Sequence, residues 1–169
     1  MEDQIINKYM RKVFELAKKG RGSTSPNPLV GALIVEGEKV LGEGYHLFSG
    51  GPHAEVMAYF EALEKTKNLS NATLYVNLEP CCHKNKKTPP CTDLISKFPV
   101  KKVVISNRDP SPLVSGNGIK ILKEQGIEVV EGILSEEGKI LNEVFFLNQS
   151  KKRPFMHLKT AISLDGKIA

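Results

Sequence analysis

The chain has 169 residues, of which 40% are hydrophobic and 25% are charged, as in a soluble globular protein. Its net charge is +5, and no apolar run approaches the roughly 20 residues that cross a membrane. This composition argues against a membrane protein, and nucleic-acid binding is poorly supported because the sequence has no Trp and no long basic stripe interleaved with aromatic residues.

The first 20 residues predict an amphipathic helix without the apolar core of a signal peptide, so we expect a cytoplasmic protein. Residues 29–36 and 39–45 predict two strands joined as a hairpin through Gly37. A helix is expected to begin at His53, because apolar side chains recur at helical spacing after it. A buried strand over 72–79, an irregular loop over 80–91 and a short helix over 91–97 follow.

The second half of the chain continues the alternation of strands and helices. It predicts a strand at 101–107, a Pro/Gly-rich loop at 108–118, a helix at 119–126, a strand at 127–133 and a helix at 135–149. This order indicates an α/β fold with about five strands and helices on both faces of the sheet.

All three cysteines, Cys81, Cys82 and Cys91, lie within eleven residues. In a cytoplasmic chain such a cluster indicates metal binding or catalysis before disulfides. Strand ends and helix starts at one sheet edge converge, so His53 and two cysteines could meet there. Three nitrogen and sulfur ligands leave a fourth zinc position for water. Glu55 could then accept a proton from that water and pass it to a leaving amine.

Other interpretations of the same residues are structural. A His at a helix start can be a polar cap or a surface residue, and a buried Cys can be a small hydrophobic residue. A closed structural zinc site with His83 or Cys82 as fourth ligand is another alternative, and it would suit a zinc-stabilised binding module.

The motifs "HAE" and "EPC" followed by "PPC" resemble those of zinc-dependent deaminases of the cytidine deaminase superfamily. Nine residues separate Cys81 from Cys91, where nucleoside and tRNA deaminases usually have two. This long insert, with "NPLVGALIV", "GEGYHLFSGGPHAE" and "RDPSPLVSGNGI", resembles the RibD family of riboflavin biosynthesis. The resemblance covers most of residues 1–150 and implies a cytidine deaminase-like three-layer αβα sandwich with a mixed sheet.

The resemblance also implies a reaction, the deamination of 2,5-diamino-6-ribosylamino-4(3H)-pyrimidinone 5′-phosphate with release of ammonia. It implies Glu55 as the proton shuttle and one zinc per chain, held by His53, Cys81 and Cys91. Cys81 is preferred to Cys82 because it follows Glu-Pro, as in the motif. The implied substrate contacts are Asn27, His46, His83, Lys87, Thr88, Asn107 and Asp109. The loop departs from the family pattern, so Lys86 is an alternative to Lys87.

The end of the sequence resembles the first strand of the reductase domain in the same family. We therefore expect a deaminase domain at 1–150, followed at 151–169 by the start of a truncated reductase domain or a C-terminal extension. We expect no reductase activity and no NADPH for this chain. The expected partner is a phosphorylated pyrimidine, with no nucleic acid and no membrane, and the resemblance suggests a homo-oligomer. The alternative enzyme is a nucleotide or tRNA base deaminase.

Overall fold

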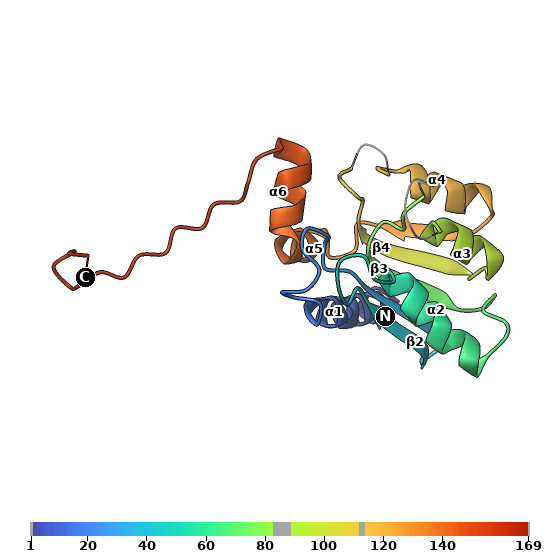
Figure 1. Cartoon of the computed structure of the whole chain (residues 1–169). Helices are drawn as coiled ribbons and strands as arrows, with labels where there is room; N and C mark the ends of the chain where they lie inside the picture. The colour runs from blue at the N-terminus through green and yellow to red at the C-terminus, as the bar shows by residue number, and fades with distance from the viewer. Residues whose placement is uncertain (1, 83–88, 112–113, 169) are drawn as a thin grey trace.

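The computed structural model describes residues 2–82, 89–111 and 114–168. These residues form one five-stranded sheet with helices on both faces (Figure 1). The elements are α1 (Glu2–Lys18), β1 (Gly31–Glu36), β2 (Lys39–Tyr45), α2 (Ala54–Lys65), β3 (Thr73–Leu78), α3 (Cys91–Lys97), β4 (Lys102–Asn107), α4 (Asn117–Glu124), β5 (Glu128–Glu131), α5 (Ser135–Leu141) and α6 (Glu143–Lys151).

The sheet is mixed, with strand order β2-β1-β3-β4-β5. β1 runs antiparallel to both β2 and β3, whereas β3, β4 and β5 run parallel to one another. The parallel pairs are connected through α3 and α4, which is how parallel neighbours are normally joined. The predicted α/β class and five-stranded mixed sheet are therefore confirmed.

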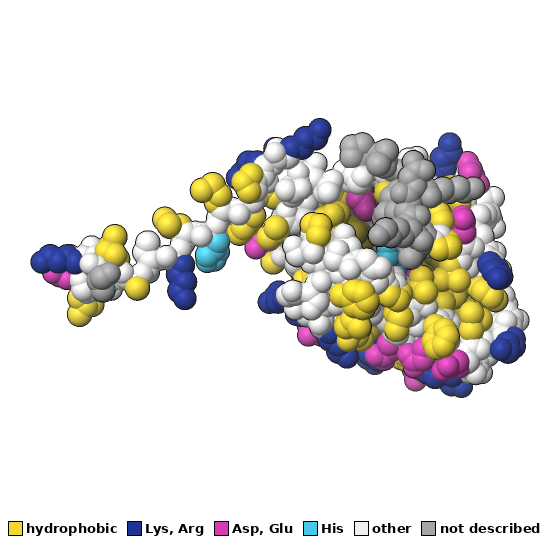
Figure 2. Space-filling model, viewed as in Figure 1, with side chains coloured by type: hydrophobic (Ala, Val, Ile, Leu, Met, Phe, Trp, Pro, Cys, Tyr) yellow, Lys and Arg dark blue, Asp and Glu magenta, His cyan; other side chains and the backbone are white. Residues whose placement is uncertain are grey.

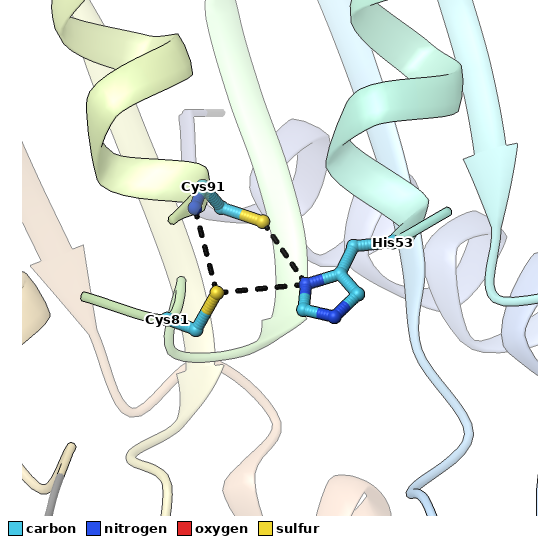
Figure 3. A group of neighbouring side chains, drawn as sticks. All are labelled: His53, Cys81 and Cys91. Carbon is cyan, nitrogen blue, oxygen red and sulfur yellow. Dashed lines mark hydrogen bonds between the residues drawn. The ribbon is translucent and has the colours of Figure 1, made fainter. Parts of the chain in front are cut away.

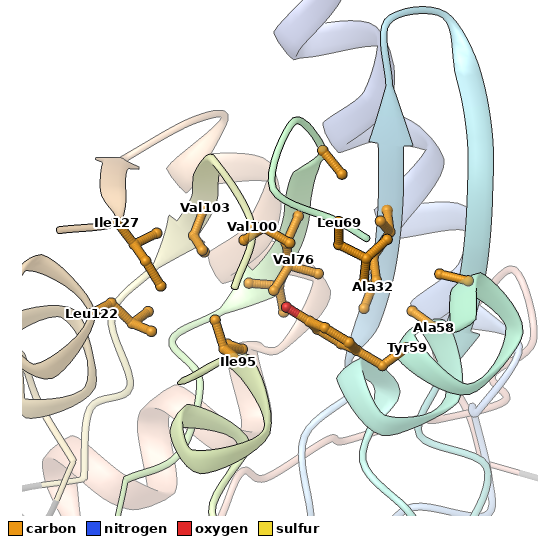
Figure 4. Packing of buried hydrophobic residues seen from close by; sticks show 14 of the residues in the cluster. Ala32, Ala58, Tyr59, Leu69, Val76, Ile95, Val100, Val103, Leu122 and Ile127 are labelled. Carbon is orange, nitrogen blue, oxygen red and sulfur yellow. The ribbon is translucent and has the colours of Figure 1, made fainter. Parts of the chain in front are cut away.

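Successive side chains of the central strands point to opposite faces and fill two separate cores. Ile34 and Leu74 pack with α2, α3 and α4 in the larger core, part of which Figure 4 shows around Tyr59, Val76 and Ile95. Leu33 and Tyr75 pack on the other face, against α1 and the residues around α5. Both faces are covered by helices, which explains why consecutive residues in the middle of these strands are apolar.

Two glycines of β2 let the start of α2 lie directly on the sheet. A Cβ at Gly44 would lie 2.1 Å from the carbonyl oxygen of Ala54, and one at Gly42 would lie 2.0 Å from that of Ala58. Any side chain at either position would push α2 away. The sequence "GEG" therefore fixes the position of the residues at the N-terminus of α2, which carry His53 and Glu55.

The C-terminal part differs from the prediction in one respect. The single helix expected at 135–149 is two helices, α5 and α6, which are separated at Asn142. The Asn142 side chain is buried and bonded to the backbone of Leu29, and its own backbone leaves the helical region (φ −115°, ψ 29°). This tertiary contact overrides the helical pattern of the sequence.

Beyond α6 the chain extends away from the body (Figure 1), and every side chain over 152–168 is exposed. The division predicted at residue 150 stays a prediction. Within the described ranges, no helix has the length and apolar character needed to cross a membrane.

Candidate active site

His53, Cys81 and Cys91 meet at one edge of the sheet, and their ligand atoms all lie within 4.8 Å of one another. The Nδ1 atom of His53 lies 3.2 Å from the Sγ of Cys91 and 3.5 Å from the Sγ of Cys81 (Figure 3). The backbone N–H of Cys91 also donates to the Sγ of Cys81 at 3.4 Å. The expected convergence of these three residues is thus present.

Each of the three residues stands at the end of a regular element. Cys81 follows the carboxyl end of β3, Cys91 is the first residue of α3, and His53 immediately precedes α2. His53 occupies the N-cap position of α2, yet its side chain makes no capping hydrogen bond. Capping therefore does not account for this histidine, whose imidazole points to the two sulfur atoms instead (Figure 3).

The donor set fits zinc. Zinc binds imidazole nitrogen at about 2.0–2.1 Å and thiolate at about 2.3 Å, so neighbouring ligand atoms in a tetrahedral site lie roughly 3.5 Å apart. The two His53–Cys distances are close to that separation. Hydrogen bonding with Cys91, supported by His53, lowers the pKa of the Cys81 thiol and favours its thiolate form. Three protein ligands leave one tetrahedral position open, as in catalytic zinc sites.

Glu55 lies in the first turn of α2 and is only 3% exposed. Burial raises the pKa of its carboxyl above the usual value, and the nearby His53 opposes that rise. A carboxyl beside the metal ligands, with a raised pKa, can accept a proton and return it within one reaction cycle.

A cavity of about 520 Å³ lies beside the cluster, and His53, Glu55 and Cys81 form part of its lining. Its volume is within the usual range for a site that takes a small molecule. Three of the predicted substrate contacts also line it, namely Asn27, His46 and Asp109.

Asn27 and His46 form a hydrogen-bonded pair next to His53. The Nδ1 of His46 lies 3.0 Å from the carbonyl oxygen of Pro52, which can only accept, so neutral His46 carries its proton on Nδ1. Its Nε2 then accepts from the Nδ2 of Asn27 at 3.1 Å. This arrangement turns the amide nitrogen of Asn27 to His46 and leaves the amide oxygen able to accept from a ligand.

The other predicted substrate contacts either lie away from the cavity lining or fall outside the described residues. The amide nitrogen of Asn107 donates to the carbonyl of Ser135 at 3.0 Å, and its oxygen accepts from the hydroxyl of Ser106, so this side chain supports α5 and is not part of the cavity lining. His83, Lys87 and Thr88, as well as the alternative Lys86, lie outside the described residues. Among the described residues, Cys82 is not part of the metal-ligand group.

One buried carboxylate near the site was not anticipated. Glu79 accepts hydrogen bonds from the backbone N–H groups of Asp109, Gly116, Gly118 and Ile119, at 2.9–3.3 Å. Glu79 therefore connects two segments. One is the turn that contains Cys81, and the other is the loop before α4 together with the first turn of that helix. The motif "EPC" contains this residue, but nothing in its sequence neighbourhood indicates donors 30 to 40 positions away.

Two further residues of the lining, Phe145 and Gln149, were also missed. They come from α6, more than 50 positions after the last metal ligand, and a spacing of four residues is found in any helix.

Comparisons with known proteins agree with this geometry. Residues 3–107 match the family described as "Cytidine and deoxycytidylate deaminase zinc-binding region". The chain is 50% identical over 166 residues to riboflavin biosynthesis protein RibD of Aquifex aeolicus, covering 98% of this chain and 46% of that protein. It is 44% identical over 169 residues to RibD of Escherichia coli, covering 100% of this chain and 44% of that protein.

A solved structure is similar over the whole chain. It is a diaminohydroxyphosphoribosylaminopyrimidine deaminase/5-amino-6-(5-phosphoribosylamino)uracil reductase from Thermotoga maritima, with 51% identity and a TM-score of 0.94. The match covers 100% of this chain and 48% of the Thermotoga chain. This chain therefore spans about half the length of the relatives that it matches.

Proposed function

This chain belongs to the cytidine and deoxycytidylate deaminase family, and from that membership we propose that it deaminates the diaminopyrimidine ribosyl phosphate of riboflavin biosynthesis. The observation that carries the proposal is the open His53, Cys81 and Cys91 cluster, with buried Glu55 beside it in one cavity. The choice of substrate rests on the similarity to RibD proteins over nearly the whole chain.

In the proposed reaction His53, Cys81 and Cys91 hold the zinc ion. Zinc, when bound, supplies Lewis-acid chemistry that makes water a nucleophile near neutral pH. Glu55 takes a proton from the attacking water and delivers it to the ring amine. A new C–O bond forms at the amine-bearing carbon, the C–N bond breaks, and the amine leaves as ammonia, so that one water is consumed.

The cavity residues orient the substrate during these steps. The amide oxygen of Asn27, held by His46, can accept one hydrogen bond from the substrate. The carboxylate of Asp109 accepts from the backbone N–H of Ser111 at 2.8 Å and lies in the same lining. The contact of His83 with the substrate, and those of Lys87 or Lys86 and of Thr88 with its phosphate, remain predictions, because these residues lie outside the described ranges.

A closed structural zinc site is less well supported than a catalytic one. Such a site needs a fourth protein ligand. Of the two candidates, Cys82 does not join the group formed by the described residues, and His83 lies outside them. The cluster also lies beside a cavity, which a purely structural ion does not require.

The substrate is tested by measuring ammonia release from the diaminopyrimidine ribosyl phosphate, dCMP and a tRNA substrate under identical conditions. The proposal predicts that kcat/KM for the first is at least about a hundredfold higher than for the others, since a site built around polar contacts rejects ligands that lack them. Equal or higher activity on dCMP or tRNA would favour the alternative base deaminase.

We also propose that residues 1–150 form the deaminase domain and that 151–169 begin a second, reductase-like domain or an extension. The exposure of every side chain over 152–168 supports this division. Deletion of residues 153–169 should leave the deaminase turnover and melting temperature unchanged. NADPH oxidation by this chain with the reductase substrate would contradict the expected lack of reductase activity.

Self-association and a cytoplasmic location remain proposals. Exposed apolar side chains gather over α2 and the loop before it, as Figure 2 shows on its front face; they include Leu47, Phe48, Met57 and Phe60. An apolar surface of this kind is typical of a protein contact. Light scattering of the purified chain would measure its mass, and a strictly monomeric mass at all concentrations would contradict a homo-oligomer.

A further inference from the structure

The lining of the cavity comes from two parts of the chain. His53, Glu55 and Cys81, with Asn27 and His46, belong to the segment 3–107 that matches the family. A second group of lining residues lies beyond this segment and includes Phe145 and Gln149 of α6. The family's name covers two substrates, cytidine and deoxycytidylate. The matched segment therefore supplies the deamination chemistry that its members share. The residues beyond it are therefore the better candidates for recognising the rest of the substrate.

α6 has a defined face toward the cavity. Phe145 and Gln149 are four residues apart and so lie on the same side of the helix, and both line the cavity. Val144 and Asn148 lie on this helix too, are exposed, and are not part of the lining. α6 has no fully buried residue. Phe145 is half-buried, its ring meets that of Phe146 edge-on, and it belongs to neither core cluster of the described residues.

The start of α6 is tied to the site by side-chain hydrogen bonds. The backbone N–H of Leu29 donates to the Oδ1 of Asn142 at 2.8 Å, and the Nδ2 of Asn142 donates to the Leu29 carbonyl at 2.9 Å. The neighbours Pro28 and Val30 line the same cavity. This double contact links two segments that are 113 positions apart and sets where α6 lies relative to the metal ligands.

We propose that Phe145 and Gln149 form the recognition face for the part of the substrate that points away from the metal. This inference rests on the proposed function and extends it. Phe145, one turn closer to Asn142, packs against the face of the pyrimidine ring beside the sugar. Gln149, one turn further along α6, hydrogen-bonds with the sugar hydroxyls, because a neutral amide can both donate to and accept from a hydroxyl.

The test measures binding separately from chemistry. In a zinc-loaded Glu55→Gln background, calorimetry with the diaminopyrimidine ribosyl phosphate compares the parent with Phe145→Ala and Gln149→Ala. Each change should weaken binding about tenfold, the usual effect of losing one buried aromatic or polar contact. Val144→Ala and Asn148→Ala are the matched controls on the same helix, and they should bind like the parent.

A second ligand separates the two roles. The free pyrimidine, which lacks the ribosyl phosphate, should bind Gln149→Ala and the parent equally, whereas Phe145→Ala should still weaken its binding. In the active background, both variants should raise KM and leave kcat within about twofold, as expected for contacts made equally in ground and transition states. Zinc content and melting temperature are measured for every variant, and Phe145→Leu replaces Phe145→Ala if the latter does not fold.

The outcomes distinguish this inference from the function on which it rests. If the wild-type chain deaminates the substrate and the folded α6 variants bind it with unchanged affinity, the proposed role of Phe145 and Gln149 is wrong. The proposed deaminase function would still stand. A folded, zinc-loaded wild-type chain that neither binds nor deaminates the ligand would overturn both.

Discussion

The Nδ1 atom of His53 lies 3.2 Å from the Sγ of Cys91, although the two residues are 38 positions apart in the sequence. One stands before α2 and the other begins α3, so the sheet edge brings two helix starts together. Cys81 completes the group from the end of β3. The separations suit one tetrahedral zinc ion, and each of the predictions below depends on a contact in or around this group.

Replacing one thiol of the group should remove the metal. Cys91→Ser is expected to reduce zinc affinity by at least about a hundredfold and to lower the melting temperature. This loss of affinity exceeds the one usually caused by changing a residue that only orients a ligand. Competition with a fluorescent chelator measures the affinity. Cys82→Ser is the control next to the site and should keep its zinc; loss of zinc from this control would mean that Cys82 is a ligand.

Glu55→Gln should keep the metal and lose the reaction. The amide has nearly the same shape but cannot transfer the proton, so kcat should fall by about 10²–10⁴-fold while the zinc content stays at one per chain. Glu64→Gln, at an exposed position of the same helix, should retain full activity. Wild-type activity in Glu55→Gln would remove the proton shuttle from the mechanism.

Glu79→Gln should destabilise the protein. Four backbone N–H groups donate to this carboxylate, and an amide would turn an NH₂ group toward some of them. We expect a loss of about 1–3 kcal/mol in the free energy of unfolding, measured by urea denaturation. Glu38→Gln, in the exposed turn between β1 and β2, is the control, and an equal midpoint for the two variants would show that the Glu79 contacts contribute little.

Gly44→Ala should disturb the site from a distance. Its new Cβ would lie 2.1 Å from the backbone oxygen of Ala54, next to His53, so α2 has to move. We expect a loss of about 1–3 kcal/mol of stability, as for other overpacked positions, together with weaker zinc binding. Gly37 has φ +60° and open space around it, and Asn tolerates this left-handed conformation better than most residues, so Gly37→Asn should cost less stability and leave zinc binding unchanged. If Gly44→Ala bound zinc as tightly as the wild type, α2 would not need this close contact with β2.

The sequence was sufficient to predict most of the helices and strands, and the convergence of His53, Cys81 and Cys91, because these signals are local. His53 and Glu55 stand at a helix start, Cys81 follows a buried strand, and Cys91 follows two prolines. The chain order of strands and helices then brings these ends to one edge of a sheet.

The residues that were missed, or whose environment differs from the expectation, depend on distant contacts. The carboxylate of Glu79 binds backbone groups 30 to 40 positions away, and Asn142 binds Leu29 across 113 positions. Asn107 was expected in the substrate site, yet its amide is directed to Ser135 on α5. No periodicity reveals such pairings, because they depend on where the chain returns in three dimensions. For the same reason, Phe145 and Gln149 could not be distinguished by sequence from an ordinary helix face.

The most direct test of the account is ammonia release from the diaminopyrimidine ribosyl phosphate, with the metal content determined on the same sample. We predict turnover with one zinc per chain, and loss of both turnover and metal on treatment with a strong chelator, followed by recovery when zinc is added back. Turnover that persists in chelated, metal-free protein would contradict the zinc mechanism. Fully zinc-loaded, folded protein without any ammonia release would contradict the proposed reaction.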